Sequence, residues 1–156
     1  MEHFVYVAFG SNLGDRKNNI LLAIDEMKKK SMEFLRISTM YETEPYGLKD
    51  QPKFINCAAL VKTSYAPMEL MDTLLDIEKS LGRVRTTKWG PRVIDIDIIF
   101  YDNRMINFVD LIIPHPDMQN IEFVLKPLAD IAPNYVHPKL KKSVVELLSE
   151  IEGVKI

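Results

Sequence analysis

The order of strand-like and helix-like segments constrains the fold of this chain more than any other feature of its sequence. In the first hundred residues, β-branched and aromatic runs such as HFVYVAFG and FINCAALVKT are separated by segments whose apolar residues recur at helical spacing. The resulting order is strand, helix, strand, strand, helix, strand. This order predicts a ferredoxin-like α+β fold, in which an antiparallel βαββαβ sheet carries both helices on one face and leaves the other face open for a ligand.

The boundaries of these segments follow from their capping and turn residues. Asp15 is positioned to cap a helix over residues 16–31, and an extended segment is expected over residues 33–43. Pro67 favours the start of the second helix, and Gly82 favours its end. The run VIDIDIIFY is the last predicted strand of the sheet.

Length and composition predict a single globular domain over residues 1–156. The chain is 47% hydrophobic and 27% charged, so its core is large enough to be stable alone, and the tail after Asn103 is interpreted as a C-terminal elaboration. A formal net charge of −2 argues against a nucleic-acid-binding or membrane-surface protein. Cys57 is the only cysteine, which excludes an intramolecular disulfide, and no secretory or membrane-spanning pattern is evident. We therefore expect a cytoplasmic protein.

Two aspartates in the last strand of the sheet are the first candidates for chemistry. Because side chains alternate along a strand, Asp95 and Asp97 share one face, and the neighbouring isoleucines face the core. Two carboxylates about 7 Å apart along a strand repel each other unless a cation lies between them. Oxygen ligands without a cysteine pair favour Mg²⁺, which commonly completes its coordination with phosphate oxygens. A solvated strand face without function is the alternative reading of this short motif.

A basic segment directly precedes this strand. GRVRTTKWGPR places Arg83, Arg85, Lys88 and Arg92 with Trp89 in eleven residues without an acid. Guanidinium groups beside metal-binding carboxylates are the arrangement expected for a bound polyphosphate. The glycines and proline of the segment suggest a loop that closes over the phosphates.

Several known nucleotide-binding motifs are absent from the sequence. It contains no G-x-x-x-x-G-K-[ST], no protein-kinase motif set and no G-x-G-x-x-G. GSNLGD follows a strand and precedes a helix as phosphate loops do, but its glycine spacing is wrong. By itself it is a weak signal.

Taken together, several motifs resemble one enzyme family. FGSNLGDR, YETEPYG followed by DQPKFIN, LGRVR, WGPRVIDIDIIFY, IPHP and FVLKPLADIAP are similar, in order and spacing, to 6-hydroxymethyl-7,8-dihydropterin pyrophosphokinase of folate biosynthesis. The resemblance extends from about Val5 to Pro138. It implies a ferredoxin-like fold and an ATP-dependent transfer of pyrophosphate to the pterin hydroxymethyl group, with release of AMP. It also implies two Mg²⁺ ions, small-molecule substrates only and a monomer.

The resemblance further implies roles for particular residues. The catalytic set would be Asp95, Asp97, Arg83 and Arg92, with both aspartates as metal ligands. The nucleotide would be bound by Met71, Glu78, Arg85, Lys88, Trp89, Arg92, Ile98 and His115. The pterin would be bound by Thr43, Pro45, Tyr46, Phe54, Asn56, Trp89 and Phe123.

The sequence departs from the family pattern near Phe123. Many members carry an arginine two residues before this phenylalanine, but here the position is Ile121. One cationic contact to ATP is therefore expected to be missing or to be replaced by Lys126 or Arg104. Cys57, next to Asn56, is expected to point the opposite way, into the core.

Two other functions fit the same fold class. A ferredoxin-like module could sense a nucleotide without turning it over. A sheet of the same topology could also bind RNA or act as a scaffold, but it would need exposed aromatics on the central strands and a basic face. The net charge and the aspartate pair argue against the RNA-binding reading.

Overall fold

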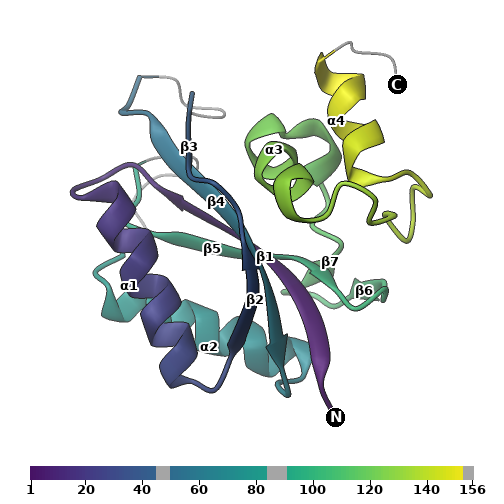
Figure 1. Ribbon diagram of the computed structural model, residues 1–156. Helices are drawn as coiled ribbons and strands as arrows, with labels where there is room; N and C mark the ends of the chain where they lie inside the picture. The colour runs from purple at the N-terminus through teal and green to yellow at the C-terminus, as the bar shows by residue number, and fades with distance from the viewer. Residues whose placement is uncertain (45–49, 84–90, 153–156) are drawn as a thin grey trace.

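The computed structural model describes residues 1–44, 50–83 and 91–152, and it shows a central sheet between two layers of helices (Figure 1). The elements, in chain order, are β1 (His3–Ser11), α1 (Arg16–Lys29), β2 (Glu33–Ile37), β3 (Tyr41–Thr43), β4 (Phe54–Thr63), α2 (Pro67–Ser80), β5 (Asp95–Tyr101), β6 (Ile106–Asn107), β7 (Ile112–Ile113), the 3₁₀ turn η1 (Met118–Asn120), α3 (Glu122–Ile131) and α4 (Val144–Glu152).

The sheet has the predicted ferredoxin-like topology. Its strands lie in the order β2-β4-β1-β5, with β3 also paired to β4, and every pairing is antiparallel. The α+β fold expected from the sequence is therefore confirmed. One detail differs, because the extended segment over residues 33–43 forms two strands, β2 and β3, instead of one.

The helix boundaries follow the predicted capping residues. The Asp15 side chain accepts a hydrogen bond from the Asn18 backbone N–H at 3.3 Å, which caps the first turn of α1. Pro67 is the first residue of α2, and Gly82 follows its end with φ = 98°, a conformation that favours glycine. Lys28 and Lys29 lie in the last turn of α1, where positive charge is favourable.

The first core layer lies between the sheet and the helices α1 and α2. Alternate residues of β1 and β4, such as Val7 and Cys57, are buried there against the apolar stripes of the two helices. Ile96 and its neighbouring isoleucines of β5 belong to the same cluster. The expected inward orientation of Cys57 is confirmed, and the aspartates of β5 therefore belong to the other face.

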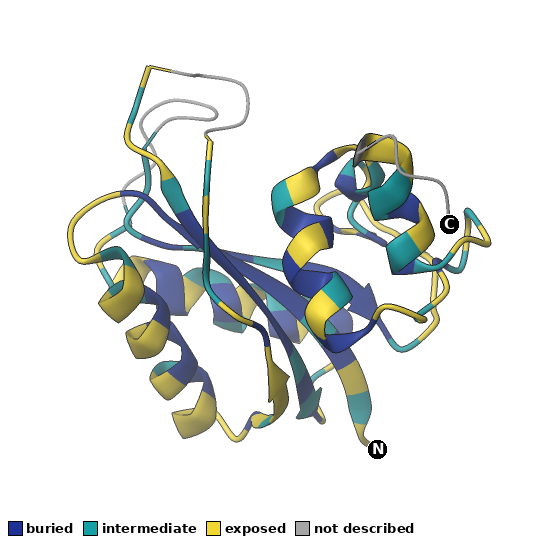
Figure 2. Cartoon of the chain, turned by 45° about the horizontal axis from the view of Figure 1, so that its top comes forward, coloured by how far each residue is buried: buried dark blue, intermediate teal, exposed yellow. Residues whose placement is uncertain are grey.

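The second face of the sheet is not open along its length, contrary to the expectation from the sequence. The C-terminal helices α3 and α4 pack on this face, and a second apolar cluster joins Ala8 and Ala58 of the sheet to Leu125 and Leu128 of α3 (Figures 1 and 2). Small side chains on β1 and β4 let the helices approach the sheet closely. The elaboration after Asn103 thus covers part of the face that the ferredoxin-like plan leaves bare.

None of the helices in the described part of the chain is long and apolar enough to cross a membrane.

A pair of substitutions in α1 tests the first core layer. Ile20 is fully buried in this cluster, whereas the adjacent Leu21 is 55% exposed. We expect Ile20→Ala to lower the free energy of unfolding by about 2–5 kcal/mol because it removes buried methyl groups and leaves a cavity. Urea denaturation measures the change. Leu21→Ala is the matched control and should change stability by no more than about 0.5 kcal/mol; equal losses would place the core on the wrong side of α1.

Candidate active site

The register of the sheet places the candidate residues in one row across its second face. Asp95 of β5 lies opposite Gly10 of β1, Gly10 lies opposite Asn56 of β4, and Asn56 lies opposite Tyr41 of β3. Residues that face each other in a ladder point to the same side of the sheet. Four strands therefore contribute to one surface, and Asp97 lies one step further along β5.

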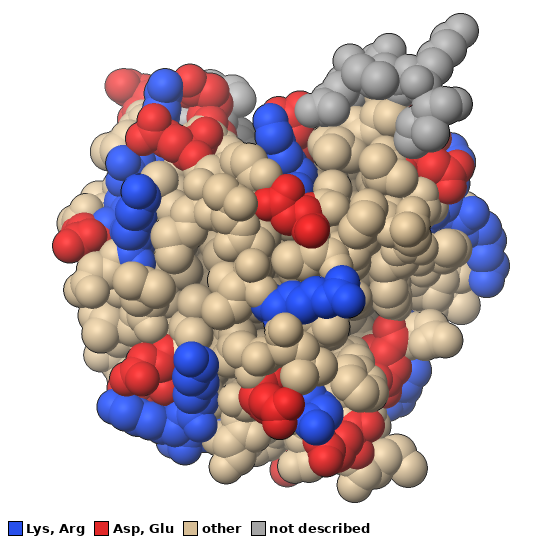
Figure 3. Space-filling model, in the orientation of Figure 1, with Lys and Arg blue, Asp and Glu red and all other residues tan. Residues whose placement is uncertain are grey.

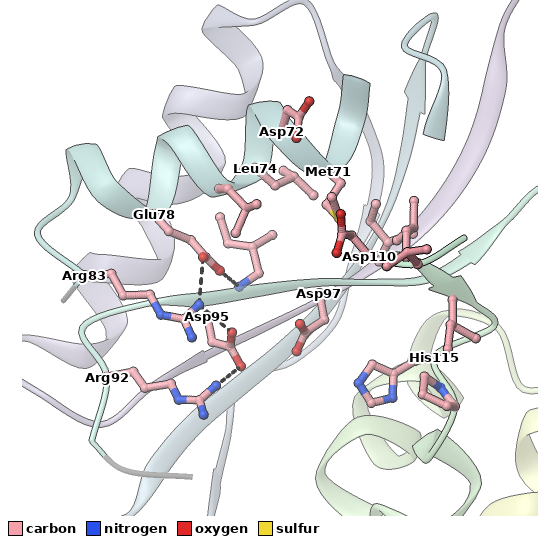
Figure 4. Close-up of a pocket in the computed structure, with 17 residues that line it drawn as sticks. Met71, Asp72, Leu74, Glu78, Arg83, Arg92, Asp95, Asp97, Asp110 and His115 are labelled. Atoms are coloured by element: carbon pink, nitrogen blue, oxygen red, sulfur yellow. Dashed lines mark hydrogen bonds and ion pairs between the residues drawn. The ribbon is translucent and has the colours of Figure 1, made fainter. Parts of the chain in front are cut away.

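A cavity of about 810 Å³ lies at the free edge of β5, between α2 and the segment around β7 (Figure 4). It brings together every described residue that the sequence assigned to catalysis or to nucleotide binding. These lining residues are Met71, Glu78, Arg83, Arg92, Asp95, Asp97, Ile98 and His115. The predicted residues Arg85, Lys88 and Trp89 lie outside the described residues.

A network of charged side chains forms one wall of the cavity. Arg83 Nη1 donates to Glu78 Oε1 at 2.7 Å and to Asp95 Oδ1 at 3.0 Å, and Arg92 Nη1 donates to Asp95 Oδ2 at 2.9 Å (Figure 4). The other oxygen of Glu78 accepts the backbone N–H of Ile96 at 2.7 Å. Glu78 is buried, and it both satisfies a backbone donor at the sheet edge and holds Arg83 in place. Both oxygens of Asp95 are occupied by guanidinium groups.

Asp97 lies in a different electrostatic environment from Asp95. Burial raises the pKa of Asp97 well above its usual value, and the nearby Asp95 and Glu78 carboxylates raise it further, while Arg92 opposes the shift. Burial also raises the pKa of Glu78, with a second contribution from Asp95. Crowded carboxylates of this kind favour either a proton or a cation between them.

The site fits a metal ion that is bound only partly by the protein. Asp95 and Asp97 supply hard oxygen ligands, and burial and the neighbouring carboxylates, which raise the pKa of Asp97, make a cation beside it favourable. Among residues 1–44, 50–83 and 91–152, however, no group of three or more His, Cys, Asp or Glu residues could hold a metal ion. The two carboxylates of Asp95 and Asp97 suit Mg²⁺, which takes one or two carboxylates and completes its coordination with phosphate and water.

His115 lies across the cavity from the charged wall (Figure 4). Burial lowers its pKa, which favours the neutral ring. Its Nδ1 accepts the Asp117 backbone N–H at 3.4 Å, so the proton of the neutral ring is placed on Nε2. His115 can thus donate one hydrogen bond into the cavity without adding a charge.

The described residues assigned to the pterin form a second group, on the same face of the sheet but nearer β3. Thr43 lies opposite Phe54 in the β3–β4 ladder, and the buried Asn56 amide donates a hydrogen bond to Thr43 Oγ1. Phe123 lies in the first turn of α3, the helix that packs over this face. Pro45 and Tyr46 lie outside the described residues.

Two residues of the GSNLGD turn have roles that the sequence motif did not reveal. A Cβ atom on Gly10 would lie 3.0 Å from Asn56 Oδ1 and 3.4 Å from Phe54 Cδ1, so glycine leaves room for these side chains.

Asn12 is buried and joins two segments of the site. Its Nδ2 donates to Gln51 Oε1 at 2.8 Å and to the Pro52 carbonyl at 3.0 Å, while its Oδ1 accepts the Arg92 backbone N–H at 2.8 Å. Only the position of the motif between a strand and a helix hinted at such a role.

Ile121 occupies the position at which many members of the resembling family carry an arginine, and its surroundings are apolar. Ile121 is buried in the second core cluster at the start of α3. Lys126 lies over the Tyr41 ring, and Arg104 lies over the Tyr101 ring. Neither of these two cations is among the described residues that line the cavity.

The comparison with family models gives one match. Residues 6–133 match the model of 7,8-dihydro-6-hydroxymethylpterin-pyrophosphokinase (HPPK). The chain belongs to this family. This is the family that the sequence motifs predicted.

Curated relatives agree with this assignment. A 2-amino-4-hydroxy-6-hydroxymethyldihydropteridine pyrophosphokinase of Bacillus subtilis is 37% identical over 100% of this chain and 91% of its own length. The corresponding protein of Aquifex aeolicus is 40% identical over 94% of this chain and 91% of its own length. A folic acid synthesis protein of Pneumocystis carinii is 46% identical over 94% of this chain, but the chain spans only 20% of that protein.

Solved structures support the fold. A Plasmodium falciparum HPPK-DHPS structure superposes on 96% of this chain with a TM-score of 0.79 at 17% identity, and the match covers 45% of that chain. The HPPK fold thus occurs in longer proteins as well as in relatives of about the length of this chain.

Substitution of Asn12 tests the junction at the base of the site. Asn12→Ala leaves the Arg92 N–H and the Pro52 carbonyl without their buried partner. We expect the free energy of unfolding to fall by about 1–3 kcal/mol because unsatisfied buried polar groups are unfavourable. Thermal and urea denaturation measure the loss. The exposed Asn18→Ala variant on α1 is the control, and an Asn12→Ala variant as stable as this control would contradict the assigned role.

Asp97→Asn tests the electrostatic strain of the site. An aspartate whose folded-state pKa exceeds its unfolded value near 3.9 destabilises the native state increasingly as the pH rises from that value through the folded pKa. The amide removes this effect. We therefore expect Asp97→Asn to be more stable than the wild type at neutral pH in the presence of EDTA, with a difference that shrinks toward pH 4.

Urea denaturation between pH 4.5 and 8 measures this difference. The exposed Asp76→Asn variant controls for the change in net charge. A variant that is less stable than the wild type at neutral pH, or a difference independent of pH, would show that Asp97 is not under electrostatic strain.

Proposed function

We propose that this chain transfers the terminal diphosphate of ATP to the hydroxymethyl group of 6-hydroxymethyl-7,8-dihydropterin and releases AMP. The observation that carries the proposal is the single cavity that joins two carboxylates of β5, two arginines and an apolar pocket under α2. Membership of the pyrophosphokinase family supports the same reaction. The cavity is of the size expected for a small-molecule ligand.

The two ends of the cavity suit the two ends of ATP. Met71 and Ile98 give an apolar surface against which a base can pack, and the neutral His115 can donate a hydrogen bond. Arg83 and Arg92 lie at the charged end, where the triphosphate would be bound. Arg83 and Arg92 contact Asp95 through Nη1, so their other guanidinium N–H groups can donate to phosphate oxygens when the nucleotide binds.

We assign two Mg²⁺ ions to Asp95 and Asp97. When bound, Mg²⁺ neutralises phosphate charge and polarises the oxygens that take part in in-line displacement at the β-phosphorus. The carboxylates of Asp95 and Asp97 would hold the ions by their negative charge, and Glu78 keeps Arg83 oriented beside them. The work of the protein is then to position and neutralise charge.

The pterin is placed against the row that runs from β5 to β3. Phe54 and Phe123 provide aromatic surfaces for a flat ring, and Asn56 and Thr43 provide donors and acceptors for its edge. Gly10 lies beneath this group and leaves space for it. Pro45, Tyr46, Trp89, Arg85 and Lys88 keep their proposed substrate-binding roles from the family resemblance.

The charge distribution does not favour the RNA-binding alternative. On the face shown in Figure 3, basic and acidic side chains alternate and do not gather by sign. A nucleic-acid surface is expected to be a continuous basic patch.

We also propose that residues 1–156 act as one pyrophosphokinase domain, as a monomer and in the cytoplasm. Light scattering on the purified chain would test the monomer. A mass of twice 18.0 kDa would contradict it.

An assay for pterin-dependent AMP tests the reaction. The chain is incubated with ATP, Mg²⁺ and the reduced hydroxymethylpterin, and AMP is quantified by chromatography. We expect AMP only when all three are present. Asp97→Asn should lower the rate by at least about 10²-fold because it removes a metal ligand, while Asp76→Asn should keep the wild-type rate.

The outcomes separate the functions. Folded wild-type protein that produces no AMP would contradict the pyrophosphokinase. Nucleotide binding without turnover would instead support the sensing module. Full activity of Asp97→Asn would show that the metal assignment is wrong.

A further inference from the structure

We propose that Tyr41 of β3 and Asp130 of α3 form a clamp that fixes the distance between the two walls of the pterin pocket. The inference rests on the proposed function, because it concerns the pocket between Phe54 and Phe123. Tyr41 and Asp130 are positioning residues in this proposal and do not touch the substrate.

The contacts of the clamp are short and come from both walls. The Tyr41 hydroxyl lies 2.7 Å from Asp130 Oδ1 and 2.8 Å from Asp130 Oδ2. Asp130 Oδ2 also accepts the Thr39 backbone N–H at 3.3 Å. Lys126 Nζ lies 5.6 Å from the centre of the Tyr41 ring, within the range of a cation–π contact. One turn of α3 thus holds both the hydroxyl and the ring of Tyr41.

The spacing along α3 connects the clamp to the pocket. Phe123, Lys126 and Asp130 stand at i, i+3 and i+7, so they lie on one stripe of the helix. The stripe of α3 that carries Phe123 therefore also carries the residues that hold Tyr41. A rotation or shift of α3 that moved one of these residues would move the others.

The spacing along β3 makes the same connection on the other wall. Tyr41 and Thr43 are two residues apart in a strand and point to the same side. Thr43 accepts from Asn56 and lies opposite Phe54, both of which belong to the proposed pocket. Because β3 has only three residues, a displacement of Tyr41 would also displace Thr43 and its hydrogen bond with Asn56.

β3 is a short strand with only three residue pairs to β4. It pairs with β4 at the end of the sheet, off the main path of strands. By contrast, α3 is anchored by buried residues such as Leu125 and Leu128, and Arg36 Nη1 donates to the Ile131 carbonyl at 2.6 Å. The clamp ties a short strand to an anchored helix, which lie beside each other in Figure 1.

The distance between Phe54 and Phe123 matters because a flat ring packs against both aromatic side chains only within a narrow range of separations. Two contacts of about 3.5–4 Å, one on each face, define this separation. The residues of the clamp are not among those that line the nucleotide cavity. The clamp should therefore affect the pterin and not ATP, which distinguishes it from a general loss of stability.

Steady-state kinetics with Tyr41→Phe, Asp130→Ala and the double variant test the clamp. We expect each single variant to raise the KM for the pterin by about 3- to 10-fold, the size of one lost hydrogen bond. The KM for ATP and kcat should stay within about twofold of the wild type. The double variant should match the single variants, because the second change removes a contact that is already lost. Asp130→Glu, which keeps a carboxylate, should recover part of the affinity.

Tyr135→Phe is the matched control. Tyr135 donates its hydroxyl to the Asp102 carbonyl and packs against the second core cluster, away from the pocket. The Tyr135→Phe variant lacks one tyrosine hydroxyl in the same layer and should leave the KM for the pterin unchanged.

Three results decide the proposal. An unchanged KM for the pterin in Tyr41→Phe and Asp130→Ala would overturn it, and so would additive effects in the double variant or an equal effect of Tyr135→Phe. The wild-type protein is assayed before the variants. If it produces no pterin-dependent AMP, the proposed function itself is overturned. The melting temperatures of all variants show whether each is folded.

Discussion

The pairing of Asp95 with two arginines is the interaction on which the rest of the site depends. Three carboxylates, Asp95, Asp97 and Glu78, lie together at the edge of the sheet. Burial raises the pKa values of Asp97 and Glu78, and repulsion from the neighbouring carboxylates raises them further. Arg83 and Arg92 offset part of this charge. The arrangement is unfavourable for the isolated chain and favourable for a ligand that brings cations and phosphates. Such a local loss of stability is common at sites that are built for binding.

The antiparallel register converts this edge into a two-part site. Asp95, Gly10, Asn56 and Tyr41 occupy one row on four strands, so the charged cavity and the proposed pterin pocket share a surface. Gly10 separates the two parts because its missing side chain leaves space for Asn56 and Phe54. The helices α1 and α2 fill the opposite face, and α3 covers the far end of the row. The layer of α1 and α2 supports the sheet and also contributes Met71 and Glu78 of α2 to the cavity.

Much of the site could be predicted from the sequence, because local rules fix it. Alternation along a strand places Asp95 and Asp97 on one face, and helical spacing places Met71 and Glu78 on one side of α2. The family motifs named the same residues, and the cavity contains all the described residues that they assigned to catalysis and to the nucleotide, but not those assigned to the pterin. The coverage of the second face by α3 and α4 could not be predicted in this way. It depends on how small residues such as Ala8 and Ala58 meet a helix distant in sequence.

The sequence by itself determined the order of the elements, the orientation of each side chain along its strand or helix, and the family. These properties depend on near neighbours in the chain, whose geometry is set by the backbone. Only the tertiary structure decided that both oxygens of Asp95 are held by arginines, that Asn12 joins two segments of the site, and that Tyr41 meets Asp130. These contacts join residues separated by up to 89 positions. Their formation depends on how whole elements pack, which no local pattern specifies.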